Sequence, residues 1–232
     1  MKILSKIIAT SLVLFTACGG GSSGATSEKA SEKIRFLNAV KQVSSINIQL
    51  GSNIFIEELP YGESTNFVEA TEGEAIPLSV TSFEQVLPIL TGDQSVESGS
   101  KTTYIFFDES RVVGLTEVTE DAVSPLPNES SLRFFNLSEK QNSVDVYLLL
   151  RGAELEDQAP AITALGFNSN SMYFSFPSGV YDIVYTASGT TTIVRKAEAV
   201  TFTKGKVYSH VLLDQIGPLI GQTSRIFEDS VF

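Results

Sequence analysis

The chain repeats part of its own sequence. Residues 34–38 (IRFLN) are echoed by residues 132–136 (LRFFN), and residues 45–48 (SINI) are echoed by residues 143–146 (SVDV). Both pairs are separated by 98 positions. Self-similarity at a fixed offset is the mark of a repeated structural unit. The pattern therefore predicts that one domain occurs twice in this chain.

A third pair of blocks continues the repeat at a larger offset. Residues 99–108 correspond to residues 205–214, now 106 positions later. The offset grows because the second copy carries extra residues around 151–163. We interpret this insertion as the largest difference between the copies and the first place to look for recognition specific to the second copy.

Each copy has the pattern of short strands. In residues 46–50 and again in 144–148, apolar side chains alternate with Asn47 or with Asp145 and Tyr147. A period of two predicts strands with one buried and one solvent-exposed face. Further strand-like runs follow at roughly 8–12-residue spacing, without long helical patterns, which is typical of sandwiches and barrels. We predict an all-β protein of two tandem immunoglobulin-like antiparallel β-sandwich domains.

Composition changes place the predicted boundaries. A low-complexity stretch (GGGSSGATSEKASEK) follows Cys18 and is typical of a flexible tether. The segment PLPNE at 125–129 interrupts any strand and lies just before the second copy. The predicted organisation is a signal at 1–17, a tether at 18–33, a first domain at 34–121, a linker at 122–131 and a second domain at 132–232.

The second copy resembles the bacterial domain-of-unknown-function family 4397. The matching blocks are residues 133–136 (RFFN), 144–147 (VDVY), 177–181 (PSGVY) and 205–208 (GKVY). The first copy has INIQ, TEG and Thr102 in three of these places, so its membership rests mainly on the internal repeat. The resemblance implies an extracytoplasmic sandwich module that often occurs in tandem. It implies no activity, because the family has none established.

The N-terminus resembles a bacterial lipoprotein signal. Lys2 and Lys6 precede a short apolar run at 7–15, and FTAC at 15–18 matches a lipobox apart from Phe15, where Leu is usual. The apolar run is far shorter than the ~20 residues that span a bilayer. We predict cleavage before Cys18 and lipidation of Cys18. The alternative is an ordinary secretory signal that ends near a cysteine.

The lipoprotein resemblance also implies a location. Gly19 follows the cysteine, rather than the Asp associated with retention at the inner membrane, so an outer-membrane, lipid-anchored place in the cell envelope is implied by analogy. Removing Lys2 and Lys6 with the signal changes the formal net charge from −11 to −13. An acidic protein of this kind is not expected to bind nucleic acid or anionic headgroups. Its predicted membrane contact is the lipid on Cys18.

No group of residues predicts catalysis. His210 is the only histidine, and it stands in a strand where the first copy has Tyr104. A catalytic triad or a multi-histidine metal site would have to be built around this one imidazole. We interpret His210 as a packing or surface residue, and we expect a protein that is not an enzyme and needs no cofactor.

Two groups in the second copy are candidate binding residues. Glu154, Glu156 and Asp157 lie in the insertion, although they lack the ligand spacing of a calcium loop. Solvated loops are the simpler explanation, with a weak calcium site as the alternative, and we predict no metal site. Tyr147 and Tyr173 are the aromatic candidates, since Phe174 and Phe176 share a strand face expected to be core.

These features favour a non-enzymatic, lipid-anchored cell-envelope protein whose two β-sandwich modules serve in binding or surface structure. The expected partner is another envelope protein or a glycan, and the sequence does not choose between them. The alternative is a carbohydrate-binding or adhesion accessory module.

Overall fold

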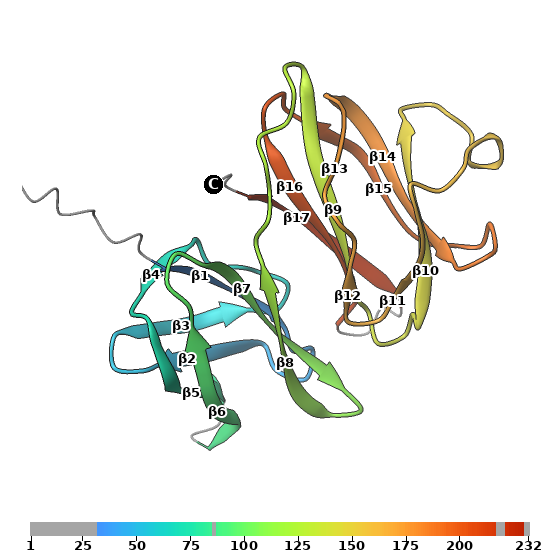
Figure 1. Cartoon of the computed structure of the whole chain (residues 1–232). Helices are drawn as coiled ribbons and strands as arrows, with labels where there is room; N and C mark the ends of the chain where they lie inside the picture. Colours follow the sequence, from blue (N-terminus) through green and yellow to red (C-terminus); the bar gives the residue numbers. More distant parts are fainter. Residues whose placement is uncertain (1–31, 85–86, 217–220, 230–232) are drawn as a thin grey trace, which may run out of the picture.

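The computed structural model describes residues 32–84, 87–216 and 221–229, and this part of the chain is built of strands (Figure 1). The predicted signal, Cys18 and nearly all of the predicted tether lie outside the described residues. One short 3-10 helix, η1 (Leu155–Asp157), is the single helical element among them. The all-β prediction is confirmed.

The first sandwich consists of two four-stranded sheets, with strand orders β4-β1-β7-β8 and β3-β2-β5-β6. Its strands are β1 (Glu32–Ala39), β2 (Ser45–Leu50), β3 (Ile54–Pro60), β4 (Val68–Ala70), β5 (Gly73–Ser82), β6 (Pro88–Val96), β7 (Lys101–Glu109) and β8 (Val112–Thr119).

The second sandwich has the same strand order, with sheets β12-β9-β16-β17 and β11-β10-β14-β15 and with β13 also paired to β9. Its strands are β9 (Glu129–Leu137), β10 (Ser143–Leu150), β11 (Ile162–Gly166), β12 (Ser169–Asn170), β13 (Phe174–Pro177), β14 (Gly179–Ala187), β15 (Ile193–Phe202), β16 (Val207–Asp214) and β17 (Gln222–Asp229). It begins within the predicted linker, at Glu129.

The predicted sandwiches of mainly antiparallel strands are confirmed, and each contains one parallel pair that the sequence did not predict. β1 runs parallel to β7, with Phe36 opposite Tyr104, and β9 runs parallel to β16, with Phe134 opposite His210. The remaining pairs are antiparallel. A period of two shows that a segment is a strand, but it does not show which distant strand pairs with it or in which direction.

Each sandwich has its own apolar core between its two sheets. The first core includes Phe36 and Phe106, which stack with ring centroids 6.1 Å apart. The second includes Phe176 and Phe202, which meet edge to face at 5.0 Å. Phe174 packs against the second core beside Phe176, as predicted.

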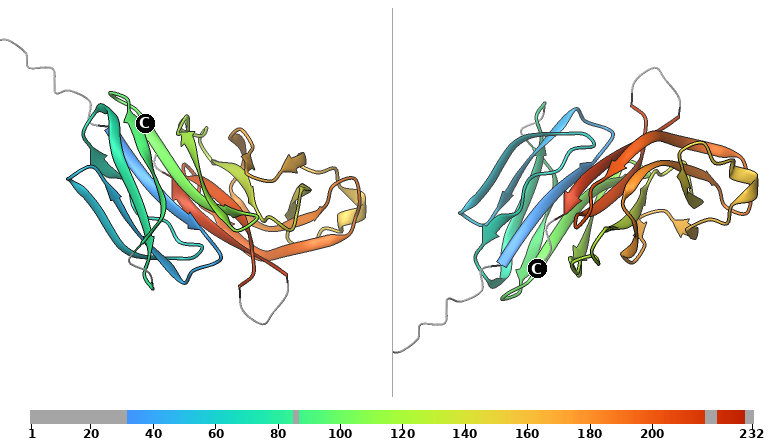
Figure 2. Two further views of the ribbon diagram at one scale, coloured as in Figure 1. Left: turned by 90° about the horizontal axis from the view of Figure 1, so that it is seen from below. Right: turned by 90° about the horizontal axis from the view of Figure 1, so that it is seen from above.

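The two sandwiches pack against each other through a third apolar cluster (Figure 2). It lies on the outward faces of the sheets that contain β1, β7, β9 and β16. These four strands are therefore buried on both faces, one in their own core and one at the junction. The cluster consists of Leu37, Ala39, Ile105, Phe107 and Val118 from the first sandwich and Phe135, Leu137, Val211 and Leu213 from the second, with Tyr61, Phe167 and Phe227 packed against it.

Candidate functional site at the junction of the two sandwiches

Two buried arginines lie at one end of this apolar junction. Arg35 in β1 and Arg133 in β9 stand at corresponding positions of the repeat, and they are 4% and 1% exposed. Their Nε atoms donate to corresponding hydroxyls, Arg35 to Thr103 at 3.1 Å and Arg133 to Ser209 at 2.7 Å. The same local arrangement therefore occurs once in each sandwich.

Two buried carboxylates join these arginines across the junction. Glu120 of the first sandwich accepts two hydrogen bonds from Arg133 Nη2, at 2.6 and 2.7 Å, and one from Arg35 at 3.0 Å. Asp229 of the second sandwich accepts from Arg35 Nη1 at 2.6 Å. Each carboxylate thus binds the arginine of the other sandwich, which makes this buried ion cluster a direct link between the two bodies.

Aromatic rings cover the guanidinium groups. Phe67 lies over Arg35 at 4.7 Å from its ring centroid, and Tyr173, the residue 106 positions later, lies over Arg133 at 4.5 Å. Only Tyr173 has a hydroxyl, which donates to Glu120 at 3.0 Å and to Asp229 at 2.8 Å. The two halves of the cluster therefore correspond in position and differ in chemistry at this residue.

The charges of the four hydrogen-bonded ionic side chains balance. Two guanidinium groups face two carboxylates, so the formal sum over Arg35, Arg133, Glu120 and Asp229 is zero. Burial by itself would raise the pKa of Glu120, but Arg133 and Arg35 hold that pKa below its ordinary value of 4.5. Burial raises the pKa of Tyr173, which keeps its hydroxyl a donor. The cluster is a satisfied structural network rather than a reactive one.

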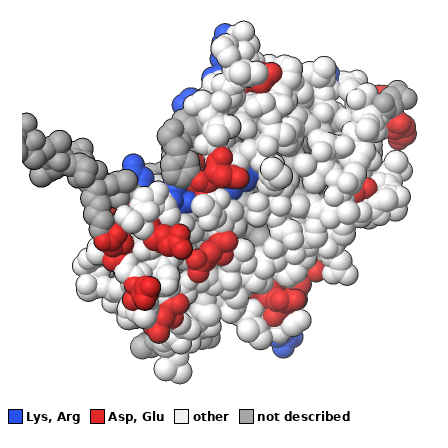
Figure 3. Space-filling view, in the orientation of Figure 1, with Lys and Arg blue, Asp and Glu red and all other residues white. Residues whose placement is uncertain are grey.

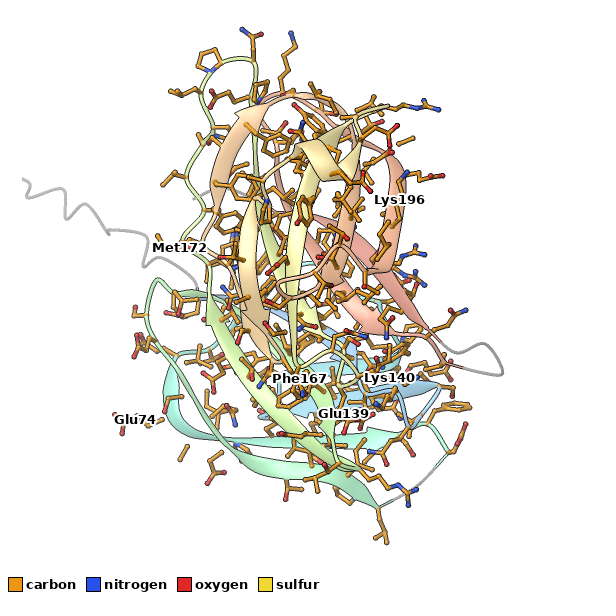
Figure 4. The ribbon with its side chains drawn as sticks, turned by 90° about the vertical axis from the view of Figure 1, so that its right-hand side faces the viewer. Glu74, Glu139, Lys140, Phe167, Met172 and Lys196 are labelled. Atoms are coloured by element: carbon orange, nitrogen blue, oxygen red, sulfur yellow. The ribbon has the colours of Figure 1, made fainter. Side chains whose placement is uncertain are left out.

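A second polar group lies at the other end of the apolar junction. Lys41 of the first sandwich pairs with Glu139 and, at 2.9 Å, with Asp214 of the second. Tyr61 Oη donates to the main-chain oxygen of Asp214 at 2.8 Å. Glu139 and Phe167 lie close to the boundary between the sandwiches in Figure 4. The junction is therefore apolar in its centre and polar at both ends.

A groove of about 780 Å³ opens beside the buried ion cluster. One wall is the segment 63–67 of the first sandwich, and the other is formed by residues 205–207 and 226–229 of the second, with Arg35 also lining the groove. On the face shown in Figure 3, acidic side chains are spread mainly over the first sandwich. This groove is our candidate binding site.

The rim of the groove carries charges in pairs. Lys206 Nζ donates to Glu228 at 2.6 Å, and Arg225 Nε lies 3.5 Å from Glu63. These four side chains are about half exposed, so each pair contributes little to stability. Because each of these positive groups is paired with a negative one, the two pairs add no net charge at the groove.

The predicted aromatic binding residues are not on a free surface. Tyr173 points out of its own sandwich and into the junction, where it is half-buried against Arg133. Tyr147 is 7% exposed and packs with Leu149, Leu155 and Val184. The prediction that this face of β10 is exposed to solvent is therefore wrong, because the insertion folds over it.

The predicted acidic residues lie at that insertion. Glu154 and Glu156 are exposed on either side of the buried Leu155, and the side chain of Asp157 lies outside what the structure describes. Among the described residues, no three Asp, Glu, His or Cys side chains gather closely enough to hold a metal ion. The insertion thus serves at least one structural purpose, which is to cover the outer face of β10 and β14.

Replacing Leu155 with alanine should therefore destabilise the second sandwich. We expect the free energy of unfolding to fall by about 2 kcal/mol. This value is at the lower end of the range for replacing a buried leucine with alanine, because Leu155 lies at the periphery of the sandwich. Urea unfolding monitored by tyrosine fluorescence measures it. The neighbouring Glu154→Ala is the control and should change stability by less than ~0.5 kcal/mol; equal stability of the two variants would mean that η1 is not a cover.

His210 is a core residue of the second sandwich, in line with the packing alternative. It is 2% exposed, and its Nδ1 lies 2.6 Å from the hydroxyl of Tyr185. Burial lowers its pKa to about 3, with a smaller contribution from the charge of Arg195. The imidazole is therefore neutral and shares a hydrogen bond with the Tyr185 hydroxyl, and Tyr104 is buried at the corresponding place in the first core.

Residues of the repeated sequence blocks accept hydrogen bonds from the main chain through their side chains. Asp145 accepts hydrogen bonds from the main chain of Ala164 and Gly189, both at 2.7 Å, and Asn47 accepts from Glu58 at 2.8 Å. Ala164 and Glu58 are corresponding bulge residues with φ of 52° and 49°. A side-chain acceptor at each bulge helps to hold this uncommon conformation.

Other motif residues also form hydrogen bonds with the main chain. Asn136 Nδ2 donates to the main-chain oxygens of Gln141 and Leu165. Tyr181 Oη donates to Pro177 O at 2.7 Å, and Tyr208 Oη accepts from the main chain of Thr203 at 3.1 Å. The motif blocks therefore specify the sandwich and its junction, and they leave the ligand unspecified.

The candidate site was missed at the sequence level, although a signal for it exists. An arginine lies inside an otherwise apolar strand in both copies, in IRFLN and in LRFFN. A charged side chain in a strand that is apolar on both faces must be paired when the strand is buried. Its partners, Glu120 and Asp229, lie at the ends of β8 and β17, where no sequence pattern marks them.

The fold and the junction define a class: an all-β protein in which two sandwiches of one topology share a buried interface. The family model described as "Domain of unknown function (DUF4397)" matches residues 32–147, half of the chain, and the chain belongs to this family. The matched region covers the first sandwich and the second as far as Tyr147 in β10. The blocks at 177–181 and 205–208 lie beyond it.

The other comparisons add little. No curated protein matches the chain. Among solved structures, the chain is similar to CBMbc (family CBM26) from Eubacterium rectale Amy13K, crystallised in complex with maltoheptaose, with 8% identity over 86% of this chain and 97% of that one and a TM-score of 0.25. A similarity of this size bears on neither the fold nor the ligand. In the described part of the chain, no helix is long and apolar enough to cross a membrane.

Proposed function

We propose that this chain is a non-enzymatic, lipid-anchored protein of the cell envelope that binds a partner through the junction of its two sandwiches. The observation that carries the proposal is the groove of about 780 Å³ between bodies held together by a buried apolar and ionic interface. Because the interface fixes both walls, the groove is preformed. Preformed binding surfaces lose little conformational entropy on association.

The chemistry of the buried groups supports binding rather than catalysis. A general base needs an accessible group whose pKa lies near the working pH. The imidazole of His210 is enclosed in a core, and the carboxylates of Glu120 and Asp229 are bound by guanidinium groups. In the described part of the chain, these three groups stabilise the fold through buried hydrogen bonds and ion pairs.

The location rests on the N-terminal sequence. The basic start, the short apolar run and FTAC at 15–18 support a lipid on Cys18, and the stretch that follows supports a tether. With an r.m.s. reach of roughly 20 Å for ~15 flexible residues, the tether would hold the sandwiches near the membrane without fixing their orientation. Outer-membrane attachment is the location that Gly19 supports.

Cys18→Ala tests the anchor. A single covalent lipid supplies the membrane affinity in this proposal, so the variant should move from the membrane pellet to the soluble fraction after cell lysis. Fractionation followed by immunoblotting measures it, and labelling with a fatty acid analogue should disappear in parallel. Ser22→Ala, in the tether, is the control. A Cys18→Ala protein that stays in the pellet would contradict lipid anchoring.

A carbohydrate ligand is the second candidate. The wall 63–67 contributes the neutral polar side chains Ser64, Thr65 and Asn66, which suit hydroxyl groups. A glycan array probed with the wild-type protein and with Asn66→Trp, which would fill the groove, tests this candidate. Glycan binding that the substitution removes would favour it.

A further inference from the structure

We propose that the groove holds an extended peptide segment of a partner protein, added as a strand to the outer edge of β17, which pairs with β16 alone among the described strands. This inference rests on the proposed binding function and names the chemistry of the ligand. A peptide that joins a sheet edge is recognised mainly through its main chain, which completes the hydrogen-bond ladder, while side-chain pockets add selectivity.

The sheet edges of the described chain differ in how they are protected. β4 and β12 are three and two residues long, and β13 is four. β3, β6, β11 and β15 each contain a shift of register, which disrupts an edge. Short and bulged strands are the usual protection against added strands. Only β8 and β17, among the described strands, are edges with eight residues in unbroken register.

These two strands occupy corresponding places, and each contacts the other sandwich. β17 does so through Asp229, which binds Arg35, and through Arg225, which pairs with Glu63. Thr116 in β8 bonds Asn168 of the second sandwich at 2.9 Å, and Tyr173 reaches Glu120 just beyond β8. At the corresponding place beside β17, Phe67 replaces Tyr173 and has no hydroxyl to reach Asp229. The groove opens there. The repeat is therefore asymmetric where β17 meets the segment 63–67.

The groove lies at the end of the β16–β17 pair, where residues 205–207 and 226–229 line it together, and along β17 it is not confined to one face. Its wall includes the four consecutive residues 226–229, and consecutive residues of a strand point to opposite faces. Every second residue of an edge strand directs its N–H and C=O away from the neighbouring strand. A peptide lying in the groove can pair with these groups.

The rim supports a main-chain ligand over a charged one. The pairs Lys206–Glu228 and Arg225–Glu63 neutralise each other around the opening. A ladder of main-chain hydrogen bonds does not depend on ligand charge. The opposite wall also limits the occupant, because the segment 63–67 stands along four residues of β17. A whole sandwich would need the full eight-residue edge, so a single extended segment fits better than a second copy of this chain.

The test uses a random 12-residue peptide library displayed on phage and selected on the Cys18→Ala form. We expect selected peptides with Kd below ~100 μM by fluorescence polarisation, a range typical of short peptides. Asn66→Trp should weaken them by roughly tenfold or more, because an indole fills the wall opposite β17. Asn53→Trp, at an exposed turn away from the groove, is the matched control and should bind normally. Melting curves establish that both variants fold.

A second measurement locates the peptide. Bound peptide should slow amide hydrogen exchange within β17 and leave β8 unchanged. The proposal is overturned if no peptide is selected, if Asn66→Trp binds as well as wild type, if exchange slows elsewhere, if the groove takes glycans instead, or if the free protein is a dimer paired through β17. None of these outcomes affects the Cys18 fractionation, so the anchor and the peptide site fail separately.

Discussion

Arg133→Met is expected to destabilise the protein by about 3–5 kcal/mol, the usual cost of removing one partner of a buried ion pair. Arg133 is 1% exposed and binds both oxygens of Glu120. Methionine fills much of the same volume but leaves this carboxylate with Arg35 as its one hydrogen-bonded guanidinium group. The free energy of unfolding, from urea denaturation, measures the effect.

Two further variants separate charge from packing. Arg151→Met removes an exposed arginine of the same sandwich and should change stability by less than ~0.5 kcal/mol. Adding Glu120→Gln to Arg133→Met should recover part of the loss, since the unpaired charge is removed. A loss below ~1 kcal/mol for Arg133→Met, or no recovery in the double variant, would mean that the ion cluster does not hold the sandwiches together.

The protein should also lose stability as the pH falls below 6.5, and His210 is the cause. Its pKa in the folded protein is about 3, below the ordinary value of 6.5, because burial disfavours the charged form. A lowered pKa means that protons bind the unfolded chain more tightly. The contribution of the neutral imidazole is therefore complete above pH 6.5 and is lost as the pH falls toward 3. The expected slope approaches about 1.4 kcal/mol per pH unit.

The buried carboxylate of Glu120 acts in a lower window, which makes its effect separable from that of His210. Arg133 and Arg35 hold the pKa of Glu120 below 4.5 against the effect of burial, so its contribution is present above 4.5 and is lost only below it. Between pH 6.5 and 4.5 the slope should therefore come mainly from His210, a loss of about 2–3 kcal/mol. Unfolding free energies measured across this range give the slope.

His210→Gln is the matched variant. Glutamine does not titrate, and its amide offers both a donor and an acceptor for the Tyr185 hydroxyl in place of Nδ1. Its stability should be nearly independent of pH between 6.5 and 4.5, even if the variant is less stable overall. A variant with the same slope as wild type would show that another group is responsible.

The repeat and the alternation of apolar residues were enough to predict an all-β sandwich. Both patterns are local: the alternation in residues 46–50 depends on burying one side of one strand, and the chain records it directly. The strand partners were not predictable in the same way. β1 pairs with β7 across 68 positions, Phe36 opposite Tyr104, and an antiparallel neighbour would have satisfied the same alternation.

Which side chains of a strand are buried was predicted correctly only where one face of that strand is exposed to solvent. Ile46 and Ile48 are buried and Gln49 is exposed, as expected. Tyr147 and Tyr173 are covered instead, the first by Leu155 of the insertion and the second by the neighbouring sandwich. A period of two indicates which residues share a face, but it does not reveal what lies opposite that face.

By itself, then, the sequence determined a duplicated β-sandwich and the residues that form each core, since these follow from short-range periodicity. Only the tertiary structure decided that the copies pack back to back, that Arg35 and Arg133 meet Glu120 and Asp229, and that a groove lies beside β17. The physical reason is that each of these features joins segments 13 to 194 residues apart. Contacts at such separations depend on how whole sheets dock, and no pattern within a single strand specifies that.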